Sequence, residues 1–181
     1  MIPIGLLPYN YTIIHEASKN LKPFNERNLT LYLNFSPNTH SDRPVIKDYI
    51  KQKFWGDTDI VIADKWITWD VYLSHLGNAK FTVSPPGVGL DCYRMWEAAI
   101  MRTIPIVLRN EISHLYDGLP VMFVDSWTDI KRENLEKFEK KYLKTFKNGC
   151  PPDRPKIWAR YWLTKIMEFK RSSKLKFCNK I

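Results

Sequence analysis

Strand-like and helix-like segments alternate along most of this chain, and the alternation restricts its fold more than any other feature. Runs rich in Val, Ile, Leu, Tyr and Phe occur at 29–35, 59–63, 80–84, 104–108 and 119–125. Helix-like segments occur at 41–54, 69–79 and 91–102, and further helices are expected from about residue 126 and over 156–170. Short links between such segments are typical of a parallel sheet with helices on both faces. The sequence therefore predicts an α/β fold: a single Rossmann-like domain with a mostly parallel sheet of about five strands flanked by helices.

Proline and glycine mark the expected boundaries of this domain. Pro3, Gly5, Pro8 and Pro23 interrupt the first segment, so residues 1–28 are expected to be irregular. Residues 29–150 form the predicted Rossmann-like domain. The sequence CPPDRP at 150–155 breaks the chain, and residues 151–181 are expected to form a C-terminal helix with a basic tail.

The composition is that of a globular protein, with 44% hydrophobic and 14% aromatic residues among 181. No apolar run approaches the roughly 20 residues that cross a bilayer, so no transmembrane segment is expected. The first residues lack the basic start of a signal peptide. Cys92, Cys150 and Cys178 form no C-x-x-C pair. These features favour a cytoplasmic location.

The net charge of +9 is concentrated in the last third of the chain. Residues 1–130 hold 12 Lys/Arg and 14 Asp/Glu, whereas residues 131–181 hold 16 and 5. This pattern fits a solvated helical surface with a basic tail, a surface that binds anionic membrane or nucleic acid, or a contribution to a phosphate-rich ligand. No nucleic-acid-binding motif stands out, which argues against a nucleic-acid partner.

The loop at 84–90, SPPGVGL, is the first candidate site. It follows an expected strand and enters an expected helix, and parallel sheets bind ligands beyond the carboxyl ends of their strands. Gly87 and Gly89 permit unusual backbone conformations and close approach of a ligand. A helix start presents unpaired N–H groups that suit a phosphate, and Arg94 could grip diphosphate oxygens. Glu97, on the same side of the helix, could accept hydrogen bonds from a ribose.

An ordinary turn is the alternative for the same residues. Asp91 could cap the helix or orient Arg94, and Asp91, Arg94 and Glu97 could form only a surface charge cluster. The loop matches neither G-x-G-x-x-G nor a phosphate-binding P-loop.

The stretch FTVSPPGVGLDCYRMWEAAIMRTIPIVLRN…LPVMFVDSW resembles the donor-binding region of exostosin-like glycosyltransferases and related sequences of large DNA viruses, algae and plants. The upstream stretch LYLNFSPNTHSDR is similar to the first strand, loop and helix of the same region. The resemblance covers roughly residues 29–130 and depends on several ordered pieces.

The resemblance implies one half of a GT-B fold that binds a nucleotide sugar, usually UDP-linked. Glu97 would hold the ribose, while Arg94 and the loop with Ser84, Gly87, Gly89 and Asp91 would hold the diphosphate. The other loop facing the diphosphate would contain Ser36, Thr39, His40 and Arg43, and Asp125 and Trp127 would lie beside the sugar or base. Arginines and helix N–H groups would replace a metal, so no cofactor or metal is expected. Asp57-Thr58-Asp59 precedes its strand and lies at the wrong edge of the sheet for a donor-bound metal.

The implied function is transfer of a sugar from a nucleotide sugar to a glycan or protein acceptor. Such enzymes have a second domain of similar size, which usually supplies the catalytic base, so the base is not identified here. A stand-alone enzyme, a partner subunit or homodimer, and binding without catalysis all remain open. The rival hypothesis is a non-catalytic module whose basic C-terminal region binds nucleic acid or acidic membrane.

Overall fold

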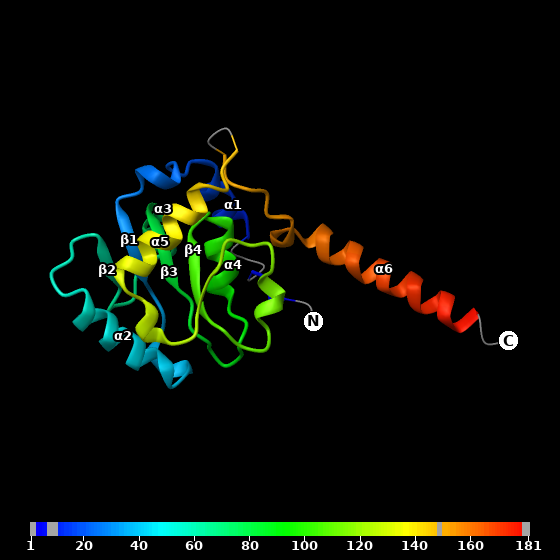
Figure 1. The fold of residues 1–181 in the computed structure, drawn as a ribbon, viewed down its shortest axis with the longest axis horizontal. Coiled ribbons are helices and arrows are strands. Elements are labelled where there is room, and N and C mark those ends of the chain that lie inside the picture. Colours follow the sequence, from blue (N-terminus) through cyan, green and yellow to red (C-terminus); the bar gives the residue numbers. More distant parts are fainter. Residues whose placement is uncertain (1–2, 7–10, 148–149, 179–181) are drawn as a thin grey trace.

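A five-stranded parallel sheet forms the centre of the computed structural model, which describes residues 3–6, 11–147 and 150–178, with side chains as far as residue 169. The strand order is β2-β1-β3-β4-β5 (Figure 1). The strands are Leu29–Leu33 (β1), Ile60–Ile62 (β2), Ala79–Val83 (β3), Ile104–Leu108 (β4) and Met122–Val124 (β5). All neighbouring strands run parallel, which confirms the predicted Rossmann-like α/β class.

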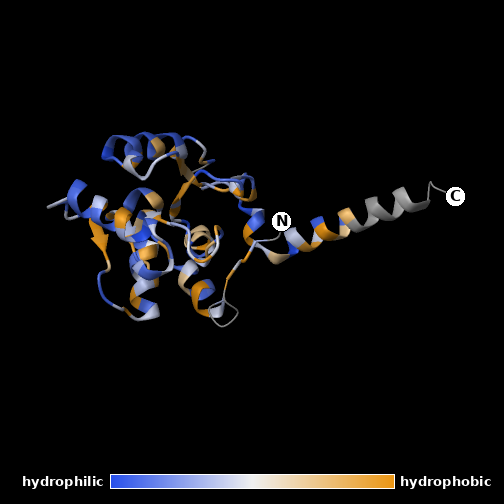
Figure 2. Ribbon diagram, turned by 90° about the horizontal axis from the view of Figure 1, so that it is seen from below, coloured by the Kyte–Doolittle hydropathy of each residue, from blue (hydrophilic) through white to orange (hydrophobic). Residues whose placement is uncertain are grey.

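Helices cover both faces of this sheet. They are Tyr11–Lys19 (α1), Asp42–Lys53 (α2), Trp69–Asn78 (α3), Tyr93–Ile100 (α4) and Arg132–Leu143 (α5). The last helix, Ala159–Cys178 (α6), extends away from the sheet (Figure 1). Side chains of α2 and α5 belong to one buried cluster, and side chains of α1, α3 and α4 belong to another. Successive strand residues supply the two clusters in turn: Leu31 and Leu33 face α2 and α5, whereas Tyr32 faces α3. Figure 2 shows hydrophobic residues concentrated between these layers.

The chain reverses its direction of winding between β1 and β3. From β1 it moves outward to β2, and it then returns to the other side of β1 to form β3. The connections that leave the carboxyl ends of β1 and β3 therefore diverge to opposite faces of the sheet. In open α/β sheets a ligand-binding crevice forms at such a switch point. The switch point of this sheet comprises the carboxyl ends of β1 and β3 together with the loops 34–41 and 84–92.

Several element boundaries differ from the sequence-based expectations. Residues Tyr11–Lys19 are helical although the leading segment was expected to be irregular. The helix expected from about residue 126 begins at Arg132, because Ser126 caps the short 3₁₀ turn Trp127–Asp129 (η5) in a reciprocal capping box with Asp129. The last helix begins at Ala159, after a second 3₁₀ turn, Pro155–Ile157 (η6).

Two buried arginines hold the carboxyl end of α4. Arg27 donates from Nη1 to the carbonyl oxygens of Ala79 (2.9 Å) and Arg102 (3.1 Å), and from Nη2 to that of Met101 (3.1 Å). Arg154 donates from Nη1 to the carbonyl oxygen of Ala99 at 2.7 Å. Burial lowers the pKa of Arg27 to about 10, and the nearby Arg154 acts in the same direction. The negative end of the helix dipole offsets part of this unfavourable burial of charge. These bonds fix the carboxyl end of α4, and the amino end of the same short helix lies at the switch point.

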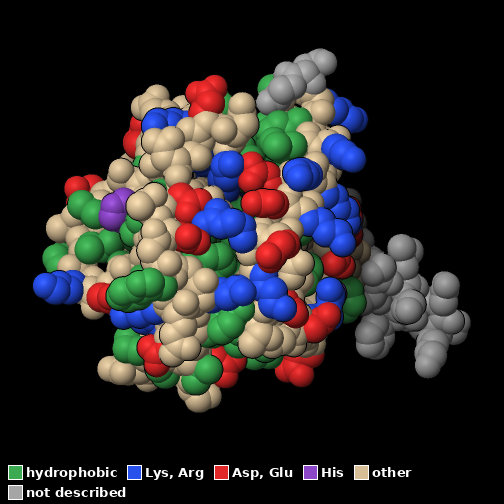
Figure 3. All heavy atoms as spheres, turned by 60° about the vertical axis from the view of Figure 1, so that its left-hand side comes forward, with side chains coloured by type: hydrophobic (Ala, Val, Ile, Leu, Met, Phe, Trp, Pro, Cys, Tyr) green, Lys and Arg blue, Asp and Glu red, His purple; other side chains and the backbone are tan. Residues whose placement is uncertain are grey.

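An acid–arginine network joins the start of β2 to the start of α5. Arg132 donates to Asp57 at 2.8 Å and to both carboxylate oxygens of Asp59 at 2.9 and 3.0 Å, and Thr30 donates to Asp59 as well. Hydrogen bonds from Arg132 lower the pKa of Asp59 to about 2. Both carboxylates of Asp57-Thr58-Asp59 are thus engaged at the amino end of β2, the edge opposite the switch point. Figure 3 shows Lys, Arg, Asp and Glu side chains intermingled on the face it presents.

Across the parts of the chain that the structure describes, none of the helices combines the length and the apolar character needed to cross a membrane.

Candidate functional site

Arg43, in the first turn of α2, joins the two loops of the switch point. Its Nε donates to the carbonyl oxygen of Pro86 (2.7 Å), and its Nη1 donates to that of Ser36 (3.0 Å). Its Nη2 lies 3.5 Å from the carbonyl oxygen of Pro85 and 3.8 Å from Cys92 Sγ. Arg43 is 6% exposed, and burial lowers its pKa. The structure therefore makes Arg43 a clamp between the two loops, with its guanidinium bonded mainly to backbone carbonyls.

Arg94, in the first turn of α4, lies beside the same clamp but is bonded differently. The guanidinium carbons of Arg43 and Arg94 each lie 5.6 Å from the centre of the Phe35 ring. Within the described part of the chain, Arg94 makes this ring contact and no hydrogen bond or ion pair, and its buried Nε has no acceptor. A buried N–H group without an acceptor costs about 1–3 kcal/mol. Two guanidinium groups thus converge on one phenyl ring, and only that of Arg43 is already satisfied.

Glu97 lies one turn further along α4 and points toward α3. Its Oε2 accepts a hydrogen bond from the Tyr72 hydroxyl at 2.7 Å, and the residue is 6% exposed. Burial raises the pKa of Glu97, while the Tyr72 hydrogen bond and the charge of Arg94 act in the opposite direction. Burial also raises the pKa of Tyr72, with the Glu97 charge as the second cause. The carboxylate that the resemblance assigns to a ribose is therefore already bonded to Tyr72 inside the protein.

Asp91 was expected either to cap α4 or to orient Arg94, and among the described residues it makes neither contact. Its Oδ1 accepts hydrogen bonds from Trp96 Nε1 and the Tyr116 hydroxyl, both at 2.9 Å, and its Oδ2 accepts one from the backbone N–H of Ile4 at 2.8 Å. Cys92, in an extended conformation, precedes the first turn of α4 and provides no side-chain cap. Asp91 therefore neither caps α4 nor contacts Arg94 in the described chain; it ties the leading segment to α4 and to the 3₁₀ turn Ser113–Tyr116 (η4).

The two glycines of the loop differ in what surrounds them. A Cβ on Gly87 would lie 3.1 Å from Arg43 Nη2 and 3.6 Å from Cys92 Sγ, whereas a Cβ on Gly89 would meet only the Asp91 carbonyl oxygen at 3.9 Å. Neither glycine has a positive φ. Neither glycine therefore adopts the unusual backbone conformation that was expected. Gly87 instead leaves room for the Arg43 guanidinium.

The remaining predicted donor-binding residues lie around the switch point. Ser84 continues β3 and is 4% exposed, and its buried Oγ has no hydrogen-bond partner in the described chain. Thr39 ends the exposed 3₁₀ turn Pro37–Thr39 (η3). His40 Nδ1 accepts a hydrogen bond from the Asp42 backbone N–H at 3.2 Å. The structure thus brings Ser84 and His40 to the same edge of the sheet as Arg43 and Arg94, with His40 engaged in the start of α2.

Asp125 and Trp127 follow β5, two strands away from the switch point. Asp125 pairs with Arg109 at 3.0 Å, and both side chains are more than half exposed. Trp127 Nε1 donates to Asp42 Oδ2 at 3.0 Å, so Trp127 lies against the start of α2. Trp127 therefore supports the helix that carries Arg43.

Sequence reasoning missed the aromatic floor of this site. The Phe35 ring lies beside both guanidinium groups, and Tyr72, which donates to Glu97, has its ring centre 6.1 Å from that of Tyr32. Asn34 donates to the Tyr32 hydroxyl at 3.0 Å. The position of Phe35, two residues beyond the end of β1, is the one signal that could have indicated its role. Tyr72 carries no comparable signal, because its contact with Glu97 joins residues 25 positions apart.

In the described residues, no three His, Cys, Asp or Glu side chains gather in a way that could hold a metal ion. What the site offers chemically is positive charge: one guanidinium with unused donors, a second one nearby, and the start of an α-helix. This combination suits an anion with several oxygens, such as a phosphate or diphosphate.

Comparison with known proteins gives no family for this chain: no family model matches it, and no curated protein matches it.

Proposed function

We propose that this chain is the donor-binding half of a GT-B glycosyltransferase. Its switch point would bind the diphosphate of a nucleotide sugar, with a UDP-sugar as the first candidate. The observation that carries the proposal is the guanidinium of Arg94, which lies at the switch point beside Arg43 and uses no hydrogen-bond donor within the described chain. Diphosphate oxygens are acceptors that match its planar set of donors.

The proposed chemistry follows from the charge that develops when a sugar leaves its nucleotide. Cleavage of the sugar–phosphate bond leaves a nucleoside diphosphate with more negative charge than it had in the donor. A guanidinium and helix N–H groups aimed at this charge stabilise the transition state more than the ground state. Arg43 would add positive charge near the diphosphate, while its hydrogen bonds to Pro86 and Ser36 hold the two loops together.

The transfer also requires an acceptor, which would be a glycan or a protein, and a catalytic base. A second domain, a partner subunit or a second copy would supply them. Glu97 would meet the ribose from the floor of the site, and Tyr72 would have to share or release its hydrogen bond for this contact to form.

A thermal-shift panel with nucleotides tests this proposal. UDP and UDP-sugars are expected to raise the melting temperature, with UMP giving a smaller rise because it lacks the second phosphate. A ligand at 100 times its Kd adds about 2.7 kcal/mol to the free energy of unfolding. Arg94→Ala is expected to remove the shift, and Arg160→Ala, which removes an exposed arginine of α6, is the matched control. Absence of any shift in the unmodified protein, or an equal shift in Arg94→Ala, would overturn the proposal.

A further inference from the structure

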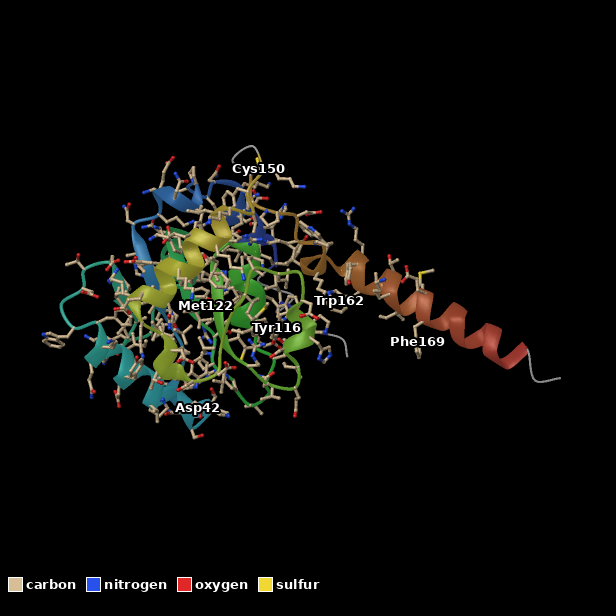
Figure 4. All side chains as sticks on the ribbon, in the orientation of Figure 1. Asp42, Tyr116, Met122, Cys150, Trp162 and Phe169 are labelled. Atoms are coloured by element: carbon tan, nitrogen blue, oxygen red, sulfur yellow. The ribbon has the colours of Figure 1, made fainter. Side chains whose placement is uncertain are left out.

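Helix α6 extends away from the body of the protein (Figure 1). It comprises Ala159–Cys178, about 30 Å of helix at 1.5 Å per residue. Its contact with the body lies at its first turns, where Trp162 packs edge-to-face on Trp96 with ring centres 6.4 Å apart. Trp162 Nε1 also donates to the carbonyl oxygen of Lys156 at 2.7 Å. Figure 4 shows Trp162 at this root of α6 and Phe169 further out along the helix.

The described part of α6 exposes a row of apolar side chains. Leu163, Ile166 and Met167 are 59%, 42% and 57% exposed. These positions are spaced three and four residues apart, so they lie on one side of the helix. Figure 2 shows hydrophobic and hydrophilic residues interspersed along this part of α6.

An apolar cavity adjoins this row at the root of the helix. It has a volume of about 490 Å³ and lies between α1, α4, η6 and α6. Three tryptophans, Trp96, Trp158 and Trp162, line it together with Leu163 and Ile166. Leu163 and Ile166 belong to both features, so the exposed apolar side of α6 and the cavity form one continuous apolar surface.

The sequence of this region is strongly basic. Residues 159–181 hold seven Lys/Arg and one Asp/Glu, a balance of +6, whereas residues 1–158 hold 21 and 18, a balance of +3. Basic residues thus accompany the apolar row over a segment of only 23 positions. A helix with apolar side chains on one side and many Lys and Arg residues is characteristic of binding at an anionic lipid surface.

Three kinds of occupant can be compared for this surface. A second copy packed along α6 would bring a segment with a balance of +6 against an identical one, which is unfavourable. A nucleic acid would attract the charge but leave Leu163, Ile166 and Met167 without a counterpart. An anionic bilayer satisfies both features, because its headgroups attract Lys and Arg while its interface accepts apolar and tryptophan side chains.

We propose that α6 and the cavity at its root bind the surface of an anionic bilayer, with the helix lying in the plane of the interface. This role is independent of nucleotide binding at the switch point. It would hold the domain close to lipid surfaces and leave the carboxyl edge of the sheet available.

Vesicle co-sedimentation with the full chain tests the proposal. The probes are large unilamellar vesicles of phosphatidylcholine with roughly 30% phosphatidylserine, which gives them a negative surface potential, and vesicles of phosphatidylcholine alone. Binding to the anionic vesicles is expected, with much weaker binding to the neutral ones. Ile166→Glu is expected to lower the partition coefficient about tenfold or more, because it removes an apolar contact and adds a charge that anionic lipid repels.

Thr164→Glu is the matched control. Residues 164 and 166 are two positions apart, about 200° around the helix, so this variant adds the same charge away from Ile166, at the edge of the apolar row beside Met167. Its partition coefficient is expected to fall much less. Equal losses in the two variants, equal binding to neutral vesicles, or no binding to either vesicle would overturn the proposal. Binding of a labelled RNA or DNA duplex that is unaffected by Ile166→Glu, without vesicle binding, would assign the charge of α6 to nucleic acid instead. The melting temperature of each variant, measured alongside, separates loss of binding from loss of folding.

Discussion

Arg43 and Arg94 contact the same phenyl ring, yet their guanidinium groups have different partners. The donors of Arg43 point to backbone carbonyls of both loops, so a substitution there would separate the loops whether or not a ligand binds. Arg94 has no such task in the described chain. A variant of Arg94 is therefore the informative one for ligand binding, and a variant of Arg43 would confound binding with folding.

The two loop glycines allow a paired prediction at the residue scale. Gly87→Ala is expected to lower the free energy of unfolding by about 1 kcal/mol, because the added methyl group presses on the Arg43 guanidinium. Gly89→Ala is expected to leave stability unchanged or to raise it by up to about 1 kcal/mol, since its surroundings are open and its φ is not positive. Urea unfolding followed by tryptophan fluorescence measures both. A loss in Gly89→Ala as large as that in Gly87→Ala would contradict the clamp at Arg43.

The buried Glu97 predicts a dependence of stability on pH. Because burial raises its pKa, the folded protein binds the proton more tightly than the unfolded chain does. Ionisation therefore costs stability as the pH rises above the unfolded pKa of about 4.5, until the folded form has also lost its proton. The free energy of unfolding of the unmodified protein, minus that of Glu97→Gln, is expected to fall over this window.

Urea titrations at a series of pH values measure this difference. Tyr72→Phe serves as a second variant, because it removes the hydrogen bond that favours the carboxylate and should make the total decline larger. A difference that stays constant or increases with pH would show that Glu97 is not buried as described.

Among the elements, α4 is supported at both of its ends. Its amino end adjoins the Arg43 clamp, and its carboxyl end accepts hydrogen bonds from Arg27 and Arg154. The helix has only eight residues, too few to be stable alone in water. Its position, and with it that of Arg94, therefore depends on these long-range contacts.

Replacement of Arg27 tests this dependence. Arg27→Met is expected to lower the free energy of unfolding by about 2–4 kcal/mol, because it leaves several buried carbonyl oxygens without a donor. Arg160→Met, at an exposed position of α6, is expected to change it by less than about 0.5 kcal/mol. Thermal or urea unfolding measures both variants. Equal, small effects would mean that α4 does not need Arg27.

The elements also show what the sequence can predict. The strands were recognisable because their apolar residues are continuous and their links short, and β4 matches its expected range of 104–108. Helix α1 was missed because prolines surround it and only Ile14 among its nine residues is buried. Such a short helix depends on packing against α3 and α4, which no local pattern reveals.

The candidate site was predictable only in its location. Parallel strands and a loop with Pro and Gly direct attention to the carboxyl ends of β1 and β3, where Arg43, Ser84 and Arg94 indeed lie. Which arginine is bonded and which is unused depends on contacts between residues about 40 positions apart, such as Arg43 with Pro86. The burial of Glu97 against Tyr72 has the same origin in tertiary packing.

For the molecule as a whole, two regions differ in charge and in shape. The body is a layered α/β domain whose surface carries both signs of charge, as the ion pairs Lys80–Glu139 and Lys47–Asp64 illustrate. The segment that contains α6 is basic, extended and partly apolar. This division suggests two separate tasks, with anion binding at the sheet edge and attachment through α6.

Calorimetric titration with UDP tests the central claim most directly. The unmodified protein is expected to bind UDP with a Kd in the micromolar range. Arg94→Ala is expected to weaken binding by about tenfold or more, as loss of charge-assisted hydrogen bonds of roughly 1.5–3 kcal/mol requires. Arg160→Ala should bind as the unmodified protein does. Failure of the unmodified protein to bind UDP, or the same Kd for the protein with and without Arg94, would contradict the assignment of the switch point as a diphosphate site.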